Sequence, residues 1–302
     1  MTIQQCFYVL KIHKTGSFSE AARELFVAQS SLSASIKQLE EELEIKIFER
    51  SKNGVVLTPD GGEFIRYASQ IVANSDFVTE RYKRGNIGSK LYVSTQHYDF
   101  IADVFSRLVS ESINEKFSFS LQEKTTYEVI CDVETAFCDL GIIAIKDEDS
   151  DIMNRYLQNK GIVFAGIFRA YPHVFLRREH PLAHSEIISF DKLADYPYLS
   201  YEQGAHSDSW FTEEAISGIE SERQVLISDR ATLMNLLLQT DAYTVGTGIM
   251  PSALNDGKIL SVPFESGSFY NVGYLFKKDR QPTPIMERFI ELLCQFAKKI
   301  DK

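Results

Sequence analysis

Apolar residues recur with helical spacing at the start of the chain. The pattern predicts a first helix over about residues 3–14, which Gly16 ends. The tetrapeptide Ser17-Phe18-Ser19-Glu20 has the form of a capping box, in which the serine oxygen accepts from first-turn amides and the glutamate reaches back. A second helix is therefore expected next, and its small residues Ala21 and Ala22 allow another helix to approach closely.

A third helix is predicted by apolar residues at spacings of 4, 3 and 4, namely Leu32, Ile36, Leu39 and Leu43. The opposite stripe holds short side chains at the helix start and a lysine further on, namely Ser30, Ala34, Lys37 and Glu41. Short polar side chains let a helix come close to base edges in the major groove of DNA. A solvated helix surface is the alternative for the same pattern.

Two strand-like runs follow, at residues 46–51 and 55–58, and they flank Lys52-Asn53-Gly54. Asn-Gly between two such runs is the strongest short signal of a β-hairpin. Three helices followed by a hairpin predict a winged helix-turn-helix over residues 1–58.

A long helix is predicted over residues 59–86, where Thr58-Pro59-Asp60 supplies a cap, a first-position proline and an early acid. One face repeats at spacings of 4 and 3 through Phe64, Ala68, Ile71, Ser75, Val78 and Tyr82. That spacing is typical of a helix that pairs with another helix, so we expect a linker helix that dimerises the chain. Packing against its own domain is the alternative.

From residue 91 onward strand-like and helical runs alternate, which is typical of parallel sheets covered by helices. The runs at 163–168 and 173–177 are expected to cross into a second lobe, and the run at 270–277 to return. The fold class is therefore multidomain α/β.

Composition narrows the class of protein. The 302 residues exceed what one core usually supports, which predicts two or more domains. No segment reaches about 18 consecutive apolar residues and the N-terminus lacks a signal-peptide pattern, so we expect a cytoplasmic protein without a membrane partner. His180 and His184 lack a nearby third ligand, and we expect no metal and no cofactor.

The four cysteines, Cys6, Cys131, Cys138 and Cys294, are spread along the chain and fit reduced thiols that pack in a core. Cys131 and Cys138 are seven residues apart on a predicted helix, which places them on one face and raises a redox-sensing alternative.

The net charge of −10 argues against nucleic-acid binding when it is taken over the whole chain. Residues 1–58, however, hold seven Lys and Arg against seven Asp and Glu, so the acidity belongs to the remainder. A neutral DNA-binding segment must place its few cations well.

The run GSFSEAARELFVAQSSLSASIKQLEEELEIKIFERSKNGVVLTPDG resembles the DNA-binding domain of LysR-type transcription regulators over almost its whole length. The later segments RREHPLAHSEIISFDKLADYPYLSY and YTVGTGIMPSAL are similar to parts of the family's effector domain. The resemblance implies a periplasmic-binding-protein-like effector domain at residues 87–302, with lobe I at about 87–163 and 269–302 and lobe II at about 164–268. It also implies a homodimer or homotetramer that binds double-stranded DNA near a promoter, with RNA polymerase as a further partner.

The resemblance places DNA contacts at the start of the second helix, on the third helix and in the hairpin: Ser17, Gln29, Ser30, Ser31, Ser33, Lys37, Arg50 and Lys52. The chain departs from the family at Ala28 and Ser30, where Ser and Pro are usual. The third helix thereby loses its usual cap, at a cost of about 1 kcal/mol unless Ser30 or Ser31 substitutes.

For the effector, the first choice is the segment after the first strand of the large domain, because ligands of open α/β sheets lie beyond the carboxyl ends of strands. The expected contacts are Thr95, Gln96 and His97, with Thr125, Ser200, Tyr201 and Thr247 as further positions. Free amides at the following helix start favour an anionic or carbonyl-bearing metabolite. A redox-sensing or ligand-independent regulator, and an enzyme fused to a helix-turn-helix, are the alternatives.

Overall fold

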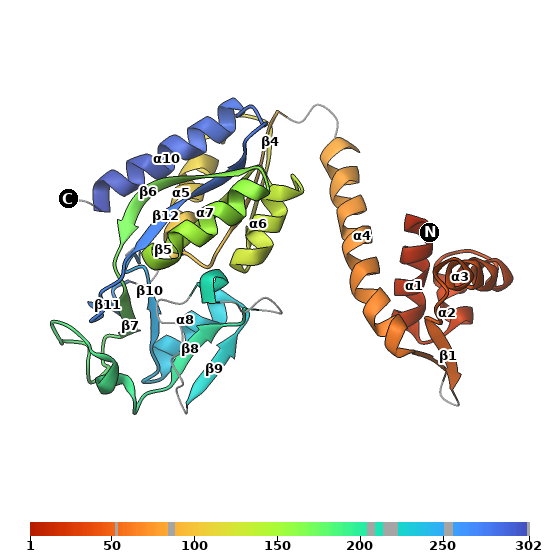
Figure 1. Cartoon of the computed structure of the whole chain (residues 1–302), viewed down its shortest axis with the longest axis horizontal. Coiled ribbons are helices and arrows are strands. Elements are labelled where there is room, and N and C mark those ends of the chain that lie inside the picture. The colour runs from red at the N-terminus through yellow and green to blue at the C-terminus, as the bar shows by residue number, and fades with distance from the viewer. Residues whose placement is uncertain (52–53, 84–87, 204–208, 214–222, 251–255, 301–302) are drawn as a thin grey trace. The chain divides into compact units, whose positions relative to one another are not determined.

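The structure is a computed structural model, and it describes residues 1–51, 54–83, 88–203, 209–213, 223–250 and 256–300. The chain divides into two compact units, Met1–Asn86 and Ile87–Lys302 (Figure 1).

The first unit consists of helices and one hairpin, in the predicted order: α1 (Ile3–Thr15), α2 (Phe18–Glu24), α3 (Gln29–Leu43), β1 (Phe48–Ser51), β2 (Gly54–Leu57) and α4 (Pro59–Lys83). The two strands pair antiparallel, with Phe48 opposite Leu57 and Ser51 opposite Gly54. The predicted apolar stripe of α3 faces the core, where Leu32, Ile36 and Leu39 are buried together with residues of α1.

The first half of the long helix α4 packs against the core of its own unit. Phe64 and Ala68 are buried there, and Ile71 packs partly against the same core. The predicted pairing seam is therefore intramolecular along this half, as in the alternative interpretation. Val78 lies further along the same face and is 53% exposed.

The second unit contains lobe I, built on a five-stranded sheet in the order β4-β3-β5-β12-β6. Its strands are β3 (Ser89–Thr95), β4 (Phe117–Glu123), β5 (Leu140–Lys146), β6 (Ile162–Ala170) and β12 (Tyr270–Lys277). The strands β4, β3 and β5 run parallel, as the alternating pattern predicts, whereas β12 pairs antiparallel with both β5 and β6.

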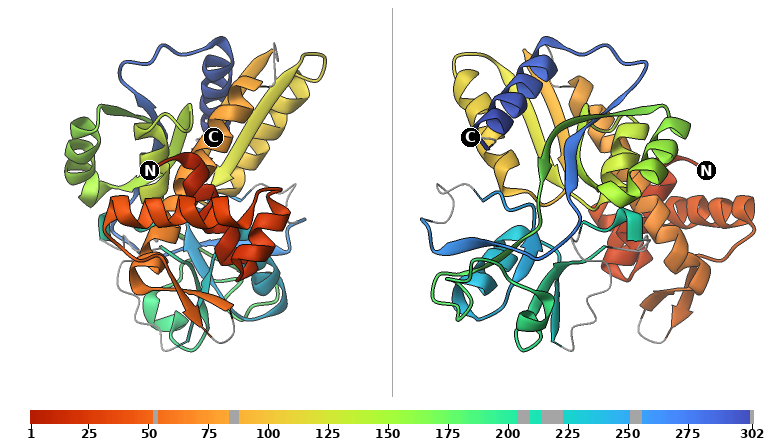
Figure 2. Two further views of the ribbon diagram at one scale, coloured as in Figure 1. Left: turned by 90° about the vertical axis from the view of Figure 1, so that its right-hand side faces the viewer. Right: turned by 60° about the vertical axis from the view of Figure 1, so that its left-hand side comes forward.

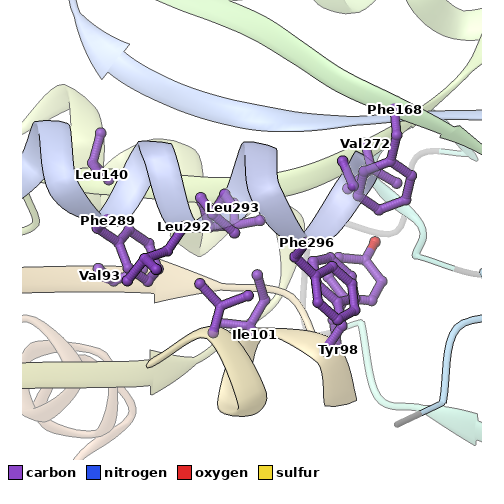
Figure 3. Packing of buried hydrophobic residues seen from close by; sticks show 14 of the residues in the cluster. Val93, Tyr98, Ile101, Leu140, Phe168, Val272, Phe289, Leu292, Leu293 and Phe296 are labelled. Atoms are coloured by element: carbon purple, nitrogen blue, oxygen red, sulfur yellow. The ribbon is translucent and has the colours of Figure 1, made fainter. Parts of the chain in front are cut away.

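Helices cover both faces of this sheet: α5 (Asp99–Glu111), α6 (Thr126–Glu134), α7 (Ser150–Asn159) and α10 (Pro284–Ile300). One core joins α5 and α10 to the sheet, and Figure 3 shows Phe289, Leu293 and Phe296 of α10 directed at it. The other core joins α6 and α7 to the opposite face. Because the side chains of β5 alternate between the two cores, the strand is buried along its whole length.

The described part of lobe II contains a three-stranded sheet, a parallel strand pair and a helix: β7 (His173–Arg177), β10 (Thr244–Gly246), β11 (Ile259–Pro263), β8 (Tyr198–Tyr201), β9 (Gln224–Ile227) and α8 (Arg230–Gln239). Short 3-10 turns lie at Asp147–Asp149, Phe190–Leu193 and Ser209–Phe211. Two chain segments connect the lobes, from β6 into β7 and from β11 back into β12, and they can be followed in Figure 2.

The change of lobe comes later in the chain than the sequence suggested. The strand β6 pairs with β12 as far as Ala170, so residues 164–170 belong to the sheet of lobe I. The next strand, β7, begins at His173 and belongs to lobe II. Periodicity identified both strands but could not decide with which sheet each one pairs.

The helix expected to carry both Cys131 and Cys138 is shorter than predicted. It ends at Glu134, and Ala136 takes a left-handed conformation with φ 57°. Cys138 therefore lies beyond the helix, and the expectation that the two thiols share one helix face was wrong.

Candidate functional site

The surface of α3 carries most of the residues that were assigned to DNA. Gln29, Ser30, Ser31 and Lys37 are exposed, and Ser33 is half-buried. Lys37 forms an ion pair of 3.4 Å with Glu41 one turn along the helix, at a site where both side chains are largely exposed. An exposed pair of this kind contributes little to stability, so the ammonium group can exchange Glu41 for another anion.

The start of α3 lacks a side-chain cap, as the departure from the family pattern predicted. The N-cap residue is Ala28, whose side chain has no atom that could accept a hydrogen bond from the first-turn amides. Neither Ser30 nor Ser31 supplies this hydrogen bond in its place. At the start of α2, the Ser17 hydroxyl accepts from the amide of Glu20. The predicted capping box is only half formed, because the Glu20 carboxylate pairs with Arg23 instead.

A buried carboxylate ties the end of α3 to the strand that follows. Glu40 Oε1 accepts from the amides of Ile47 and Phe48, at 2.8 and 3.2 Å, and Oε2 lies 2.9 Å from Lys46 Nζ. Burial raises the pKa of Glu40, but these hydrogen bonds outweigh it and the pKa is lowered. Among the seven acidic residues of 1–58, no local pattern distinguishes Glu40, because its partners Ile47 and Phe48 lie beyond the helix.

The structure describes both strands of the hairpin but not residues 52–53 between them. Arg50 lies on β1 opposite Val55, in the register that the Asn-Gly turn predicted. Lys52 lies outside the described residues.

The second unit has a cleft between its lobes, with a cavity of about 60 Å³ that opens to solvent. Four of the seven predicted effector residues line it: His97 from lobe I, and Ser200, Tyr201 and Thr247 from lobe II. Apolar side chains form much of the remaining wall, including Phe175, Leu233, Met234, Val245 and Met250. A mostly apolar wall with a few polar groups is typical of the sites that bind small organic ligands.

The other three predicted residues do not line the cleft. The Gln96 side chain is fully buried: it donates to Thr126 Oγ1, and its oxygen accepts from the amide of Ala144 at 2.7 Å. Thr125 caps α6 in a complete capping box with Glu128. Thr95 is fully buried, and its hydroxyl has no hydrogen-bond partner among the described residues.

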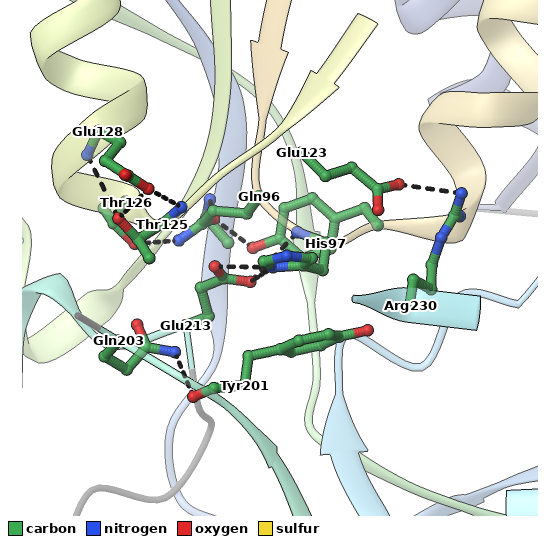
Figure 4. A network of polar contacts seen from close by, with 12 residues as sticks. Gln96, His97, Glu123, Thr125, Thr126, Glu128, Tyr201, Gln203, Glu213 and Arg230 are labelled. Atoms are coloured by element: carbon green, nitrogen blue, oxygen red, sulfur yellow. Dashed lines mark hydrogen bonds and ion pairs between the residues drawn. The ribbon is translucent and has the colours of Figure 1, made fainter. Parts of the chain in front are cut away.

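At the edge of the cleft, His97 is enclosed by Glu213, which follows a segment packed on lobe I, and by Tyr201 of lobe II. The Glu213 carboxylate lies 3.2 Å from the backbone N of His97 and 3.1 Å from ring Nδ1 (Figure 4). The Tyr201 ring stacks on the imidazole, with centroids 3.9 Å apart and planes 11° apart. Burial lowers the pKa of His97, but the hydrogen bond and charge of Glu213 outweigh it, and the pKa is raised.

An ionic contact of Arg230 joins the two lobes. Arg230, at the start of α8, places Nη1 2.8 Å from Asp99. Its Nη2 lies 2.9 Å from Glu123 (Figure 4). Burial raises the pKa of both Asp99 and Glu123, and the guanidinium group only partly offsets it. Sequence reasoning missed Arg230 and Glu213 because their partners lie more than a hundred residues away along the chain.

At three of the four cysteines the surroundings disfavour the thiolate. Burial raises the pKa of Cys6 and Cys131, and it raises the pKa of Cys138 to about 12. Redox reactivity depends on the thiolate, which is scarce at neutral pH in such surroundings. Among the residues that the structure describes, no group of three or more His, Cys, Asp or Glu side chains is placed to hold a metal ion, and no helix is long and apolar enough to cross a membrane.

Comparison with known families assigns both units. Residues 3–62 match the family described as "Bacterial regulatory helix-turn-helix protein, lysR family", and residues 114–297 match the "LysR substrate binding domain". The chain belongs to the LysR family. The resemblance drawn from the sequence and the predicted multidomain α/β fold are thus confirmed. This family consists of transcription regulators and not of enzymes, which removes the enzyme alternative.

Individual relatives support the assignment. YcgK of Bacillus subtilis, an uncharacterized HTH-type transcriptional regulator, is 32% identical over 176 residues, or 55% of this chain. The transcriptional activator CmpR of Synechocystis sp. is 26% identical over 68% of this chain. The aligned stretches span 52% of YcgK and 64% of CmpR. The crystal structure of CbnR, a LysR family transcriptional regulator, matches 98% of this chain and 99% of its own with a TM-score of 0.63 and 16% identity, which shows a shared fold.

Proposed function

We propose that this LysR-family chain is a cytoplasmic transcription regulator that binds promoter DNA through the surface of α3 and changes its activity when a small molecule enters the cleft of the second unit. The observation that carries the first half is that Gln29, Ser30, Ser31 and Lys37 of α3 are exposed, whereas its apolar stripe is buried. Short polar side chains and one cation on a helix are suited to contacts in the major groove.

The hairpin and the start of α2 add contacts to the DNA backbone. Ser17 lies at a helix N-terminus, where free amides favour a phosphate group, and Arg50 lies on the strand that leads into the hairpin. The Glu40 carboxylate fixes the end of α3 to Ile47 and Phe48, so the helix and the hairpin keep one relative position.

The cleft supports the second half of the proposal. Its residues come from both lobes, and the ion pair of Arg230 with Asp99 and the stacking of Tyr201 on His97 cross from one lobe to the other. A ligand that binds here changes the contacts that hold the lobes together, which is the differential interaction that a conformational response requires. The solved complex of full-length CbnR with its target DNA supports the same use of the fold.

The experiment is a selection of genomic DNA fragments on the purified full chain, followed by a footprint on the selected fragments. We expect protection of a partly palindromic site, because we propose that the chain acts as a homo-oligomer. RNA polymerase is the proposed partner at such a promoter. Failure to enrich any fragment would contradict the proposed function.

A further inference from the structure

A short segment of the chain lies on lobe I, although its neighbours along the chain form lobe II. Residues 209–213 come between β8, which ends at Tyr201, and β9, which begins at Gln224, and these two strands pair with each other in lobe II. Phe211 nevertheless belongs to the core that joins α6 and α7 to the sheet of lobe I, where it is 4% exposed. We call residues 209–213 the clasp.

The first half of the clasp is held by aromatic packing. The Phe211 ring meets the rings of Tyr127 and Tyr156 edge-on, with centroids 5.4 Å away in both cases. The Trp210 ring meets the Tyr156 ring in the same manner at 5.3 Å. Aromatic pairs of this kind are attractive beyond the apolar area that they bury. The clasp is therefore attached to α6 and α7 by a hydrophobic anchor.

The second half of the clasp makes polar contacts with two strand ends of lobe I. Thr212 Oγ1 accepts from Nζ of Lys146, the last residue of β5, at 3.4 Å. The Glu213 carboxylate faces the backbone amide and Nδ1 of His97, which follows the end of β3 (Figure 4). The side chains of His97 and Glu213 are 6% and 5% exposed, so this contact is shielded from water. The clasp thus combines a hydrophobic anchor with a polar contact, as a bound peptide does.

The clasp contacts lobe I at the place where lobe II closes over it. The Tyr201 ring of lobe II stacks on the same His97 imidazole, with centroids 3.9 Å apart. The cavity that remains in the cleft has a volume of about 60 Å³, whereas pockets for small organic ligands usually measure about 300 Å³ or more. A ligand of that size therefore requires the lobes to move apart.

We propose that the clasp keeps the cleft closed in the unliganded chain, and that its release from lobe I opens the cleft to a ligand. This inference rests on the proposed function, because it concerns how the regulator admits its effector. The clasp follows Tyr201 closely along the chain, and a short tether gives an effective concentration on the order of millimolar. While Phe211 stays anchored, Tyr201 is thereby kept near His97. Loss of the anchor shifts the population toward the open cleft.

The test follows two signals of the full chain without ligand. Hydrogen exchange at the backbone amide of His97 reports the clasp, because Glu213 accepts from that amide. A nuclear Overhauser contact between the His97 and Tyr201 rings reports closure, and it is identified by its absence from Tyr201→Leu. We expect the ring contact in the wild type. In Phe211→Ala we expect its loss, together with exchange at His97 that is about tenfold faster or more.

Phe105→Ala is the matched control, because it removes a phenyl ring from the other core of lobe I and should keep both wild-type signals. Trp210→Ala serves if Phe211→Ala fails to fold, because the Trp210 ring is only partly buried and the change leaves Phe211 in place. We expect Trp210→Ala to weaken the ring contact and to speed exchange at His97, both to a smaller extent than Phe211→Ala does.

Three results would overturn the proposal: no ring contact in the wild type, an unchanged ring contact in the clasp variants, or an equal loss of it in Phe105→Ala. The second result counts whether or not exchange at His97 becomes faster, because release of the clasp would then leave the lobes closed. Selection of genomic DNA by the same preparations tests the proposed function separately, because it requires no ligand.

Discussion

Arg230, the first residue of α8, lies 2.8 Å from Asp99, the first residue of α5, and so joins the helix starts of two lobes. Both side chains are mostly buried, and the same guanidinium group also meets Glu123. Removal of one partner from such a group leaves the others buried without their counter-charge. The stability of the closed cleft therefore depends on this arginine.

We expect Arg230→Gln to lower the free energy of unfolding of the second unit by about 3 kcal/mol at pH 7. The loss should shrink as the pH falls, because burial raises the pKa of Asp99 and Glu123 and protonated carboxyls need no counter-charge. Denaturant unfolding at pH 7 and pH 4.5 measures both effects. Arg155→Gln, on the exposed surface of α7, is the control. An equal loss at both pH values would count against the ionic account.

The contribution of Arg230 to stability falls as the pH falls, whereas the contribution of the His97–Glu213 pair falls as the pH rises. The pKa of His97 is raised in the folded chain, so its contribution is complete below the unfolded value of 6.5 and is lost as pH rises through the folded value. The groups that face this imidazole are Glu213, Glu123, Arg230 and the Tyr201 ring. We expect the melting temperature of the wild type to exceed that of Glu213→Gln by more at pH 6 than at pH 9. A constant difference would show that the pair does not titrate.

Thr95 tests the cost of a buried hydroxyl group that has no hydrogen-bond partner among the described residues. Its hydroxyl is buried and unpaired among the described residues, whereas the Thr126 hydroxyl accepts from Gln96. An unsatisfied buried polar group costs about 1 to 3 kcal/mol, and valine keeps the shape of threonine without it. We expect Thr95→Val to raise the melting temperature and Thr126→Val to lower it, in scanning calorimetry of the unliganded chain. A lower melting temperature for Thr95→Val would show that this hydroxyl has a partner.

The distant half of α4 provides the test of assembly. Phe64 and Ala68 pack within the first unit, so a charged residue placed there would disturb that core. Val78 is exposed, and a charge introduced at Val78 tests only the pairing of α4 with a second copy. We expect Val78→Asp to yield monomers in light scattering, since a buried carboxylate disrupts a helix pair. Ala73→Asp places the same charge on another side of the helix and should leave the oligomer intact. A native oligomer of Val78→Asp would remove this face from the interface.

The sequence predicted those features that depend on neighbours along the chain. The stripe from Leu32 to Leu39 and the Asn-Gly turn each fix a local structure, and the helices and hairpin of the first unit formed as expected. The predicted end of α6 was wrong because Ala136 takes the left-handed conformation after the helix, and alanine is not a residue type that signals a helix C-terminus. Glycine or asparagine is the usual signal there.

The cleft was only partly predictable. The rule that ligands lie beyond strand ends led to His97, which lines the cleft, but also to Thr95 and Gln96, which are buried within the lobe. Whether a side chain at a strand end turns inward or outward depends on packing that no local pattern encodes. Arg230 reaches the site from lobe II, and Glu213 from a segment packed on lobe I, so both pairings depend on contacts between distant parts of the chain.

The measurement that tests the central claim most directly is the affinity of the full chain for its selected genomic fragment, with Lys37→Ala compared to the wild type by fluorescence anisotropy. We expect Lys37→Ala to weaken binding by about 1 to 3 kcal/mol, with a salt dependence about one unit shallower if the ammonium group meets a phosphate. Lys192→Ala, an exposed change in lobe II, should bind as the wild type does. Equal affinity and an equal salt dependence for Lys37→Ala, with the same result for Gln29→Ala and Ser33→Ala, would contradict the claim that α3 is the DNA-binding surface.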